Sequence, residues 1–227
     1  MQAKELTPKE KFLRQITNFL QTNRIFLLVL LIIIVVFIIT FAIFSEVSKS
    51  TTEKSTKIVE QVQLSFDQWG VEEEEDVKKA IEEDILSETG LILEKYPRKY
   101  AGQRALFILG NLYFEKEEWD KAAENYKLLA DRFPDSYLAP VALVNAAVSL
   151  EESGNVEEAL SVYESAVTMY RDTSPHTPFI LFSLGRLYES MGETETARDR
   201  YNEIIDDFST SSWTNLARNR IISLNVK

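Results

Sequence analysis

Residues 103–134 read QRALFILGNLYFEKEEWDKAAENYKLLADRFP, and the spacing of large and small side chains in this stretch decides the fold. Counted from Gln103, Leu or Tyr stands at positions 4, 7, 11 and 24, and Gly or Ala stands at positions 8 and 20. A closely similar spacing recurs in copies that begin at Pro140 and Pro178, each 37 or 38 residues after the previous start. Three copies in phase predict stacked pairs of helices.

These positions resemble the tetratricopeptide repeat, in which two antiparallel helices cross where both carry small residues. The crossing residues here are Gly110, Ala147 and Gly185 on the first helices, and Ala122, Ala159 and Ala197 on the second helices. Small side chains allow a close approach, and the Leu and Tyr positions fill the space between helices. The resemblance implies a tetratricopeptide-repeat α-solenoid. Together with the apolar segment described below, the expected fold is all-α: an N-terminal transmembrane helix followed by this solenoid.

The turns inside the copies are expected at residues 118–120, 153–155 and 191–193. The copies also depart from the usual pattern, since position 4 is Leu in all three instead of Trp. Three repeats over residues 101–212 need caps, because an end pair cannot bury both of its faces. Residues 213–227 are predicted to form a C-terminal capping helix, and residues 46–100 a linker and a degenerate leading helix pair, whose helices run from about 56 to 69 and 75 to 97.

The segment from Ile25 to Ser45 contains no charged residue. Its 21 residues match the roughly 20 that a helix needs to cross the hydrocarbon core of a bilayer. A buried helix of a soluble protein rarely stays apolar on every face for six turns. A cleaved signal peptide has a shorter apolar run and a small-x-small cleavage site. We therefore interpret residues 25–45 as an uncleaved transmembrane helix.

Charge is distributed unevenly around this segment. Residues 1–24 form a basic tail of net charge +3, whereas the rest of the chain carries −14. The excess of Lys and Arg before the span predicts a cytoplasmic N-terminus and a C-terminal domain on the far side, which is the periplasm in a bacterium. Residues 9–23 carry large apolar side chains at helical spacing. They are expected either to lie on the membrane surface or to extend the membrane helix, and the sequence does not separate the two.

Several function classes find no support in the composition. The chain has no cysteine and one histidine, His176, so thiolate metal sites and sites with several imidazoles are excluded. Acidic residues at 72–76 fall on an expected helix start, which they favour electrostatically without forming a cation site. An acidic body also disfavours nucleic acid. We expect no catalytic residues, no metal, no cofactor and no small-molecule substrate.

The partners expected instead are other proteins, with the membrane engaged through one helix. In the repeat family, positions 2, 5, 9, 12 and 13 of the first helices line the binding groove, which also places Glu115, Val141, Glu151, Glu152 and Ser190 on this surface. Carried over by position, the residues expected to bind a partner are Arg104, Phe107, Asn111, Phe114, Val144, Val148, Phe179, Phe182, Arg186 and Glu189. The competing expectation is that residues 56–69, with Phe66 and Trp69, fill this groove as part of the core.

A basic tail, one span and a repeat domain that ends in a short helix resemble the YfgM-like family of ancillary subunits of the bacterial Sec translocon. The resemblance implies a chaperone-like role beside the translocon in the bacterial inner membrane. The alternative is a scaffold subunit of a cell-envelope complex for outer-membrane assembly, division or a motor. The sequences EKYP at 94–97 and DRFP at 131–134 resemble repeats of outer-membrane assembly proteins.

Overall fold

The computed structural model describes residues 7–225, and every regular element within them is an α-helix, which confirms the all-α prediction. The chain divides into two compact units between Glu53 and Lys54. The helices are α1 Pro8–Thr22, α2 Arg24–Val71, α3 Glu75–Lys95, α4 Tyr100–Glu115, α5 Trp119–Arg132, α6 Ala139–Glu152, α7 Val156–Tyr170, α8 Thr177–Ser190, α9 Thr194–Asp207 and α10 Trp213–Leu224. Of the expected tail and cap, residues 1–6 and 226–227 lie outside the described residues.

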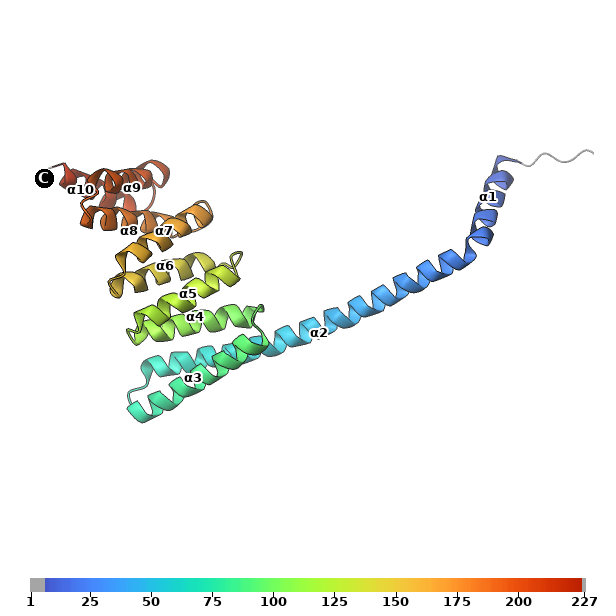
Figure 1. The fold of residues 1–227 in the computed structure, drawn as a ribbon, viewed down its shortest axis with the longest axis horizontal. Helices are drawn as coiled ribbons and strands as arrows, with labels where there is room; N and C mark the ends of the chain where they lie inside the picture. Colours follow the sequence, from blue (N-terminus) through green and yellow to red (C-terminus); the bar gives the residue numbers. More distant parts are fainter. Residues whose placement is uncertain (1–6, 226–227) are drawn as a thin grey trace, which may run out of the picture. The chain divides into compact units, whose positions relative to one another are not determined.

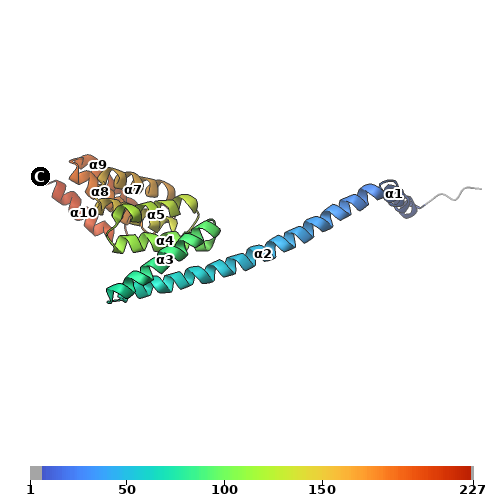
Figure 2. The same cartoon turned by 60° about the horizontal axis from the view of Figure 1, so that its bottom comes forward.

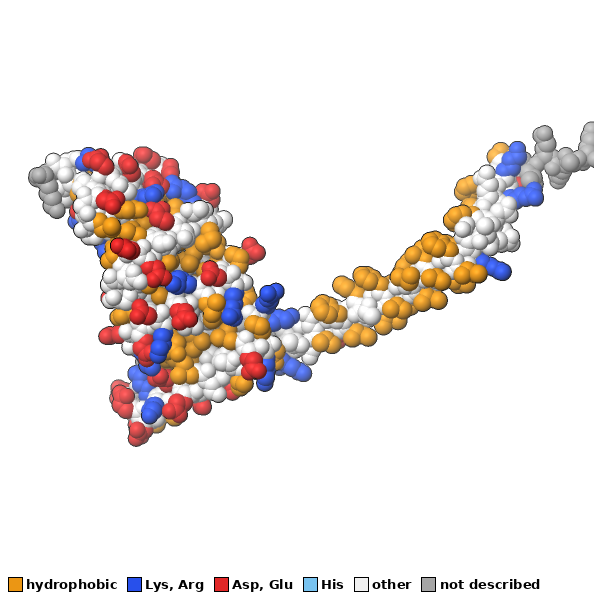
Figure 3. All heavy atoms as spheres, viewed as in Figure 1, with side chains coloured by type: hydrophobic (Ala, Val, Ile, Leu, Met, Phe, Trp, Pro, Cys, Tyr) orange, Lys and Arg blue, Asp and Glu red, His pale blue; other side chains and the backbone are white. Residues whose placement is uncertain are grey.

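The N-terminal unit consists of α1 and the first part of α2. The apolar run of α2 is long enough to cross a membrane, and none of its most apolar stretch is buried. Figure 3 shows hydrophobic side chains along the visible face of this part of the helix, and the sequence from Ile25 to Ser45 contains no charged residue. Leu31, Ile33 and Phe37 are among the large apolar residues that are more than half exposed here.

The expected end of the membrane helix near residue 45 is not a helix end. Helix α2 continues to Val71, so the apolar segment and the first helix of the leading pair are one helix of 48 residues. The physical reason lies in the sequence after Ser45, which contains no Pro before Val71 and reaches its first Gly at Gly70. Its polar residues are compatible with a helix, so nothing ends the helix earlier.

The repeat unit, from Lys54 onward, stacks its helices in chain order from α3 to α10 (Figures 1 and 2). The end of α2 and helix α3 share one buried cluster with α4, in which Val62 and Trp69 lie with Ile85 and Ala105. A second and larger cluster runs without interruption from α4 to α10. Each pair of helices is therefore buried by its neighbours, as expected for a repeat array.

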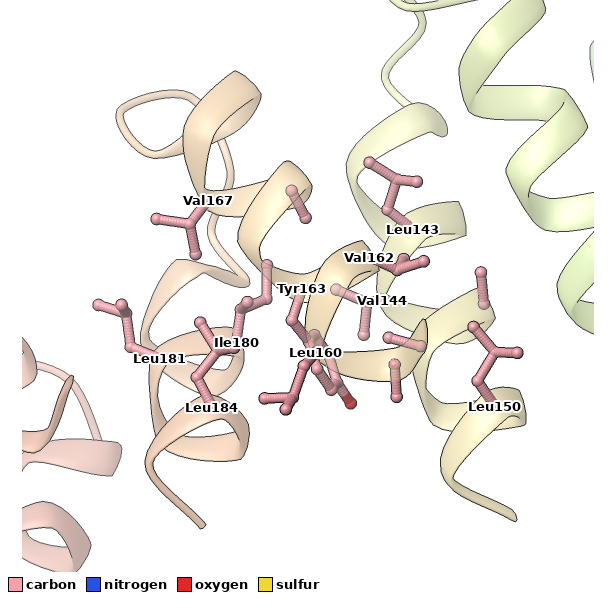
Figure 4. Packing of buried hydrophobic residues seen from close by; sticks show 14 of the residues in the cluster. Leu143, Val144, Leu150, Leu160, Val162, Tyr163, Val167, Ile180, Leu181 and Leu184 are labelled. Carbon is pink, nitrogen blue, oxygen red and sulfur yellow. The ribbon is translucent and has the colours of Figure 1, made fainter. Parts of the chain in front are cut away.

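The crossing points of the helix pairs are closed by tyrosines. Tyr126, Tyr163 and Tyr201, all at position 24, are at most 1% exposed. A Cβ atom placed on Gly110 would lie 2.5 Å from Cε1 of Tyr126, and one on Gly185 would lie equally close to Tyr201. Figure 4 shows the packing in the second copy, where Tyr163 lies among Leu160, Ile180 and Leu184. The two glycines at the crossings of copies one and three therefore lie against an aromatic ring.

The turns within the three copies occupy the same repeat positions, 14 to 16, and follow one backbone pattern. Gly154 and Gly192 adopt φ of 80° and 81° in the expected turns of copies two and three. In copy one, α5 already begins at Trp119, so the prediction of a turn at 118–120 is wrong by two residues. Glu117 takes the left-handed conformation there, with φ of 57°. Copy one has Glu117 where the other two copies have glycine. No glycine therefore indicated the position of this turn in the sequence.

Candidate protein-binding groove

The first helices of the copies, α4, α6 and α8, form one face of the repeat unit, which we call the groove face. Two hollows lie on it. The first hollow has a volume of about 310 Å³ and lies where α4, α5 and α6 meet the end of α2. Its lining residues are Phe66, Asn111, Phe114, Glu115, Tyr126, Asn145 and Val148.

The second hollow lies between α6, α8 and the capping helix α10, with a volume of about 390 Å³. Its lining residues are Val148, Glu151, Glu152, Phe179, Phe182, Ser183, Arg186 and Trp213. Val148 lines both hollows and is partly buried. The two hollows are therefore adjacent parts of one surface and not separate sites.

Aromatic rings build the walls of the second hollow. Phe179 and Phe182 lie with their ring centroids 5.3 and 5.1 Å from that of Trp213, and Phe182 also contacts Tyr201 at 5.5 Å. In the first hollow, Phe114 meets Trp119 edge to face at 5.0 Å. Rings held by other rings keep an apolar surface in place without closing it, and such surfaces are typical of binding sites.

Two carboxylates on the groove face are held by fixed donors. Glu151 accepts a hydrogen bond of 2.9 Å from the hydroxyl of Tyr163 and forms an ion pair with Arg186. Glu189 accepts a bond of 3.3 Å from the hydroxyl of Tyr201 and pairs with Arg220, whose Nη2 lies 2.5 Å from Oε1. Both carboxylates are thus neutralised by neighbours within the chain.

The tyrosine hydroxyls stay protonated in this arrangement. Burial raises the pKa of Tyr201 to about 12, and the negative charge of Glu189 contributes to the increase. Burial and the charge of Glu151 raise the pKa of Tyr163 in the same way. The hydroxyls therefore remain donors at any physiological pH, and the geometry of the groove face does not depend on their titration.

The structure brings six of the ten predicted groove residues to the hollows. These six are Asn111, Phe114, Val148, Phe179, Phe182 and Arg186. They come from all three first helices, α4, α6 and α8.

The other four predicted residues have different surroundings. Phe107 packs its ring edge to face on Tyr126 at 5.8 Å, and Arg104 donates a bond of 2.7 Å to Gln63. Glu189 is occupied by its ion pair, as described above. Val144 is 7% exposed and lies among the buried side chains between α6 and α7 (Figure 4). Its short side chain does not reach the hollows, so its assignment to the groove is wrong.

Residues 56–69 pack mainly against α3 and α4, and most of them do not line the hollows. Val59, Val62 and Trp69 are buried in the cluster that α2 shares with α3 and α4. Only Phe66, whose ring stacks on Trp69 at 6.0 Å, lines the first hollow. This segment therefore contributes one wall to the groove face and leaves the volume of both hollows open.

Sequence reasoning missed four residues that complete the hollows. Asn145 and Ser183 both stand at position 6, three residues before position 9 on the same helix face, so helical spacing could have identified them. Tyr126 was assigned to the core, where its ring lies, but its hydroxyl reaches Asn111 with a bond of 2.6 Å. Trp213 starts the capping helix, whose register the repeat spacing does not determine.

Elsewhere in the described residues, no group of three or more His, Asp or Glu side chains is arranged to hold a metal ion. His176 lies in a wide hollow of about 820 Å³ at the loop edge, beside Tyr137, Met169 and Tyr170. What the groove face offers chemically is a ring-lined surface on which Glu151 and Glu189 are paired with arginines, whereas Glu115 and Glu152 are exposed.

The fold and this surface define the class: a helical-repeat scaffold of the kind that generally mediates contacts between proteins. The family model described as a tetratricopeptide repeat-like domain matches residues 17–226. The chain belongs to the tetratricopeptide repeat-like domain family. The matched range includes the apolar stretch as well as the repeats.

Individual relatives agree with this assignment. A TPR repeat-containing protein of Treponema pallidum (strain Nichols) is 30% identical over 127 residues, which is 56% of this chain. The chain spans about half the length of that relative, 52%. Two crystal structures of putative kinesin light chain TPR-like repeats from Podosopora anserina, one of them a point variant, match with TM-scores of 0.55 and 0.53 at 12% identity. The matches cover 70% and 69% of this chain and 77% of each matched chain, and they show a shared fold.

Proposed function

We propose that this protein is a membrane-anchored module that binds other polypeptides through the two hollows of the groove face, with residues 25–45 as the anchor. The observation that carries the proposal is the pair of open, aromatic-walled hollows that share Val148. A preformed surface loses little conformational entropy on binding, and an anchor raises its local concentration at the membrane.

The chemistry of the hollows defines the partner segment. Each hollow accommodates an apolar side chain against Phe114 or against Phe182 and Trp213. Glu115 and Glu152 are exposed on the rims and form no ion pair within the described residues. A segment with two apolar anchors flanked by Lys or Arg would therefore complement the surface, and an acidic segment would be repelled.

More specifically, we propose that the N-terminus is cytoplasmic and the repeat unit periplasmic. The protein then acts as a chaperone-like ancillary subunit of protein translocation at the bacterial inner membrane. The excess of basic residues before the span supports this orientation. The family match from residue 17 to residue 226 supports treating the apolar segment and the repeats as one functional chain.

Site-specific photocrosslinking in cells tests the proposal. A benzophenone amino acid is placed at Val148 or Phe182 in the full chain, and at Ser161, an exposed residue of α7, as the matched control. We expect adducts from the two groove positions and none from position 161. Translocon subunits and nascent chains among the adducts support the translocation role. Equal labelling from all three positions would show that the groove face is not the binding surface.

A second candidate, a scaffold in a cell-envelope complex, has its own supporting feature. The EKYP and DRFP sequences come together at the loop edge, where a hollow of about 600 Å³ is lined by Leu93, Pro97, Arg98, Asp131, Arg132 and Phe133. A crosslinker at Arg132 reports on this edge. A fixed set of envelope proteins captured there, with no nascent chains at position 182, would favour the scaffold.

A further inference from the structure

Helix α1 is a separate helix with its own ends. At its start, Thr7 and Glu10 form a capping box, in which the backbone N–H of Thr7 donates to Oε2 of Glu10 at 2.7 Å. At its end, the backbone N–H and the side-chain Nδ2 of Asn23 donate to the carbonyl oxygen of Phe19 at 3.0 and 2.9 Å. The backbone of Asn23, with φ of −104° and ψ of 14°, separates α1 from α2. The chain therefore does not continue the apolar helix towards its N-terminus.

The helix has two chemically different sides. At about 100° per residue, its large apolar residues occupy one arc of about 120°. These residues are Phe12, Leu13, Ile16, Phe19 and Leu20, and each is at least 40% exposed. The opposite arc carries Lys11, Arg14 and Asn18 with other polar side chains. No residue of α1 is buried, so nothing within the N-terminal unit covers the apolar arc.

Charge and position indicate what covers it. Lys9, Lys11 and Arg14 outnumber Glu10, so α1 carries a net positive charge. The apolar run of α2 begins directly after it, at Ile25. A short basic amphipathic helix next to a membrane span is suited to the interface between headgroups and acyl chains. A protein that covered this arc instead would need its own apolar groove at the depth of the headgroups. No other observation indicates such a partner.

We propose that α1 binds the surface of an anionic bilayer, with Phe12, Ile16 and Phe19 inserted below the headgroups and Lys11 and Arg14 at the phosphates. This inference rests on the anchoring of α2 in the same membrane. It assigns a second, peripheral membrane contact to a segment that the protein-binding proposal does not use.

The absence of cysteine allows a direct test in the full chain. Single cysteines at Phe12, Ile16 and Phe19 on one arc, and at Asn18 and Gln21 on the other, carry a spin label in the protein reconstituted into vesicles that contain phosphatidylglycerol. Ile33→Cys reports on the span. We expect the apolar-arc labels to collide about threefold less with a water-soluble nickel complex than the polar-arc labels, and more with oxygen. Lys11→Gln with Arg14→Gln should reduce this contrast, as should vesicles of phosphatidylcholine alone.

Each contrary result has a distinct reading. Equal exposure of both arcs to nickel would overturn the proposal and leave α1 a solvated helix. Equal protection of both arcs at the depth of the label at position 33 would overturn it in favour of a continued span. A contrast that disappears when the protein is diluted in excess lipid would identify contact with a second copy instead. A water-exposed label at position 33 would refute the anchor itself, which separates failure of the proposed function from failure of this inference.

Discussion

Copies one and three of the repeat differ from copy two at the point where their helices cross. Gly110 and Gly185 leave no room for a Cβ atom, because a tyrosine ring in each copy lies 2.5 Å from where it would stand. In copy two the same position is Ala147, which is fully buried beside an equally buried Tyr163. The tyrosine at position 24 therefore packs against either Gly or Ala at position 8. How closely the two helices of a pair approach each other is thus a local property of that pair.

This difference explains why a buried core runs without interruption through unequal copies. Each pair adjusts its own crossing, and neighbouring pairs contact one another through large side chains such as Leu106, Leu143 and Leu181. In an array whose stability is a sum of local terms, a change at one crossing is expected to act mainly on that pair and its neighbours. Substitutions at the crossings test this view directly.

The largest expected effect is that of Ala159→Leu in copy two. Ala159 is fully buried opposite the first helix of its pair, so three added carbon atoms have no space. We expect a loss of about 3 kcal/mol in the free energy of unfolding, measured by urea denaturation of the chain in detergent. An unchanged midpoint would mean that residue 159 is not at the crossing and that the register of copy two is wrong.

A smaller loss is expected when the glycines of the tight crossings are replaced. Gly110→Ala and Gly185→Ala place a methyl group against a tyrosine ring that is itself buried, and each should cost about 1–2 kcal/mol. Gly90→Ala in α3 is the matched control, since nothing lies within 4 Å of its added Cβ. That control should gain up to about 1 kcal/mol from helix propensity alone. If the three substitutions changed the free energy of unfolding equally, the tyrosine rings would move aside at no cost in stability.

The reverse change in copy two sharpens the same comparison. Ala147→Gly removes a methyl group that copy two accommodates and adds backbone freedom in the unfolded chain, so it should destabilise by about 1 kcal/mol in the same urea series. Stabilisation by this substitution would show that Ala147 is as crowded as an alanine at position 110 would be. The proposed difference between the copies would then be wrong.

The fold was predictable from the sequence because its determinants are repeated and local. The spacing of small and large residues predicted the stacked helices from α4 onward, and the absence of charge from Ile25 to Ser45 located the apolar segment. The continuity of α2 was not predictable in the same way. The composition changes at Glu46, but a change from apolar to polar residues alters the surroundings of a helix without ending it.

Part of the candidate groove was predictable from the sequence. The rest was not, because side-chain length differs at position 5 and because the capping helix has no counterpart in the repeat. Position 5 is Phe in copies one and three, and the rings of Phe107 and Phe182 remain partly exposed. The same position in copy two is Val144, whose short side chain does not extend beyond the core. Trp213 escaped prediction because a capping helix has no counterpart in the repeat from which a position could be transferred.

The smallest expected effect concerns the first turn, where copy one lacks the glycine that copies two and three share. In all three turns the chain closes the helix in the same way. The N–H of Glu118 donates to the carbonyl of Tyr113 at 2.9 Å, as Asn155 does to Leu150 at 2.8 Å and Glu193 to Tyr188 at 2.9 Å. This pattern places one residue in the left-handed region, where glycine is favoured.

Copy one places Glu117 at that point, with φ of 57°, and its side chain is exposed. Glu117→Gly should therefore raise the free energy of unfolding by about 0.5–1 kcal/mol, because relief of backbone strain exceeds the added entropy of the unfolded chain. Gly154→Ala and Gly192→Ala, measured in the same denaturant series, should lower it by a similar amount. A destabilised Glu117→Gly variant would mean that the Glu117 side chain stabilises the turn more than its backbone conformation costs, and copy one would then have a turn of its own kind.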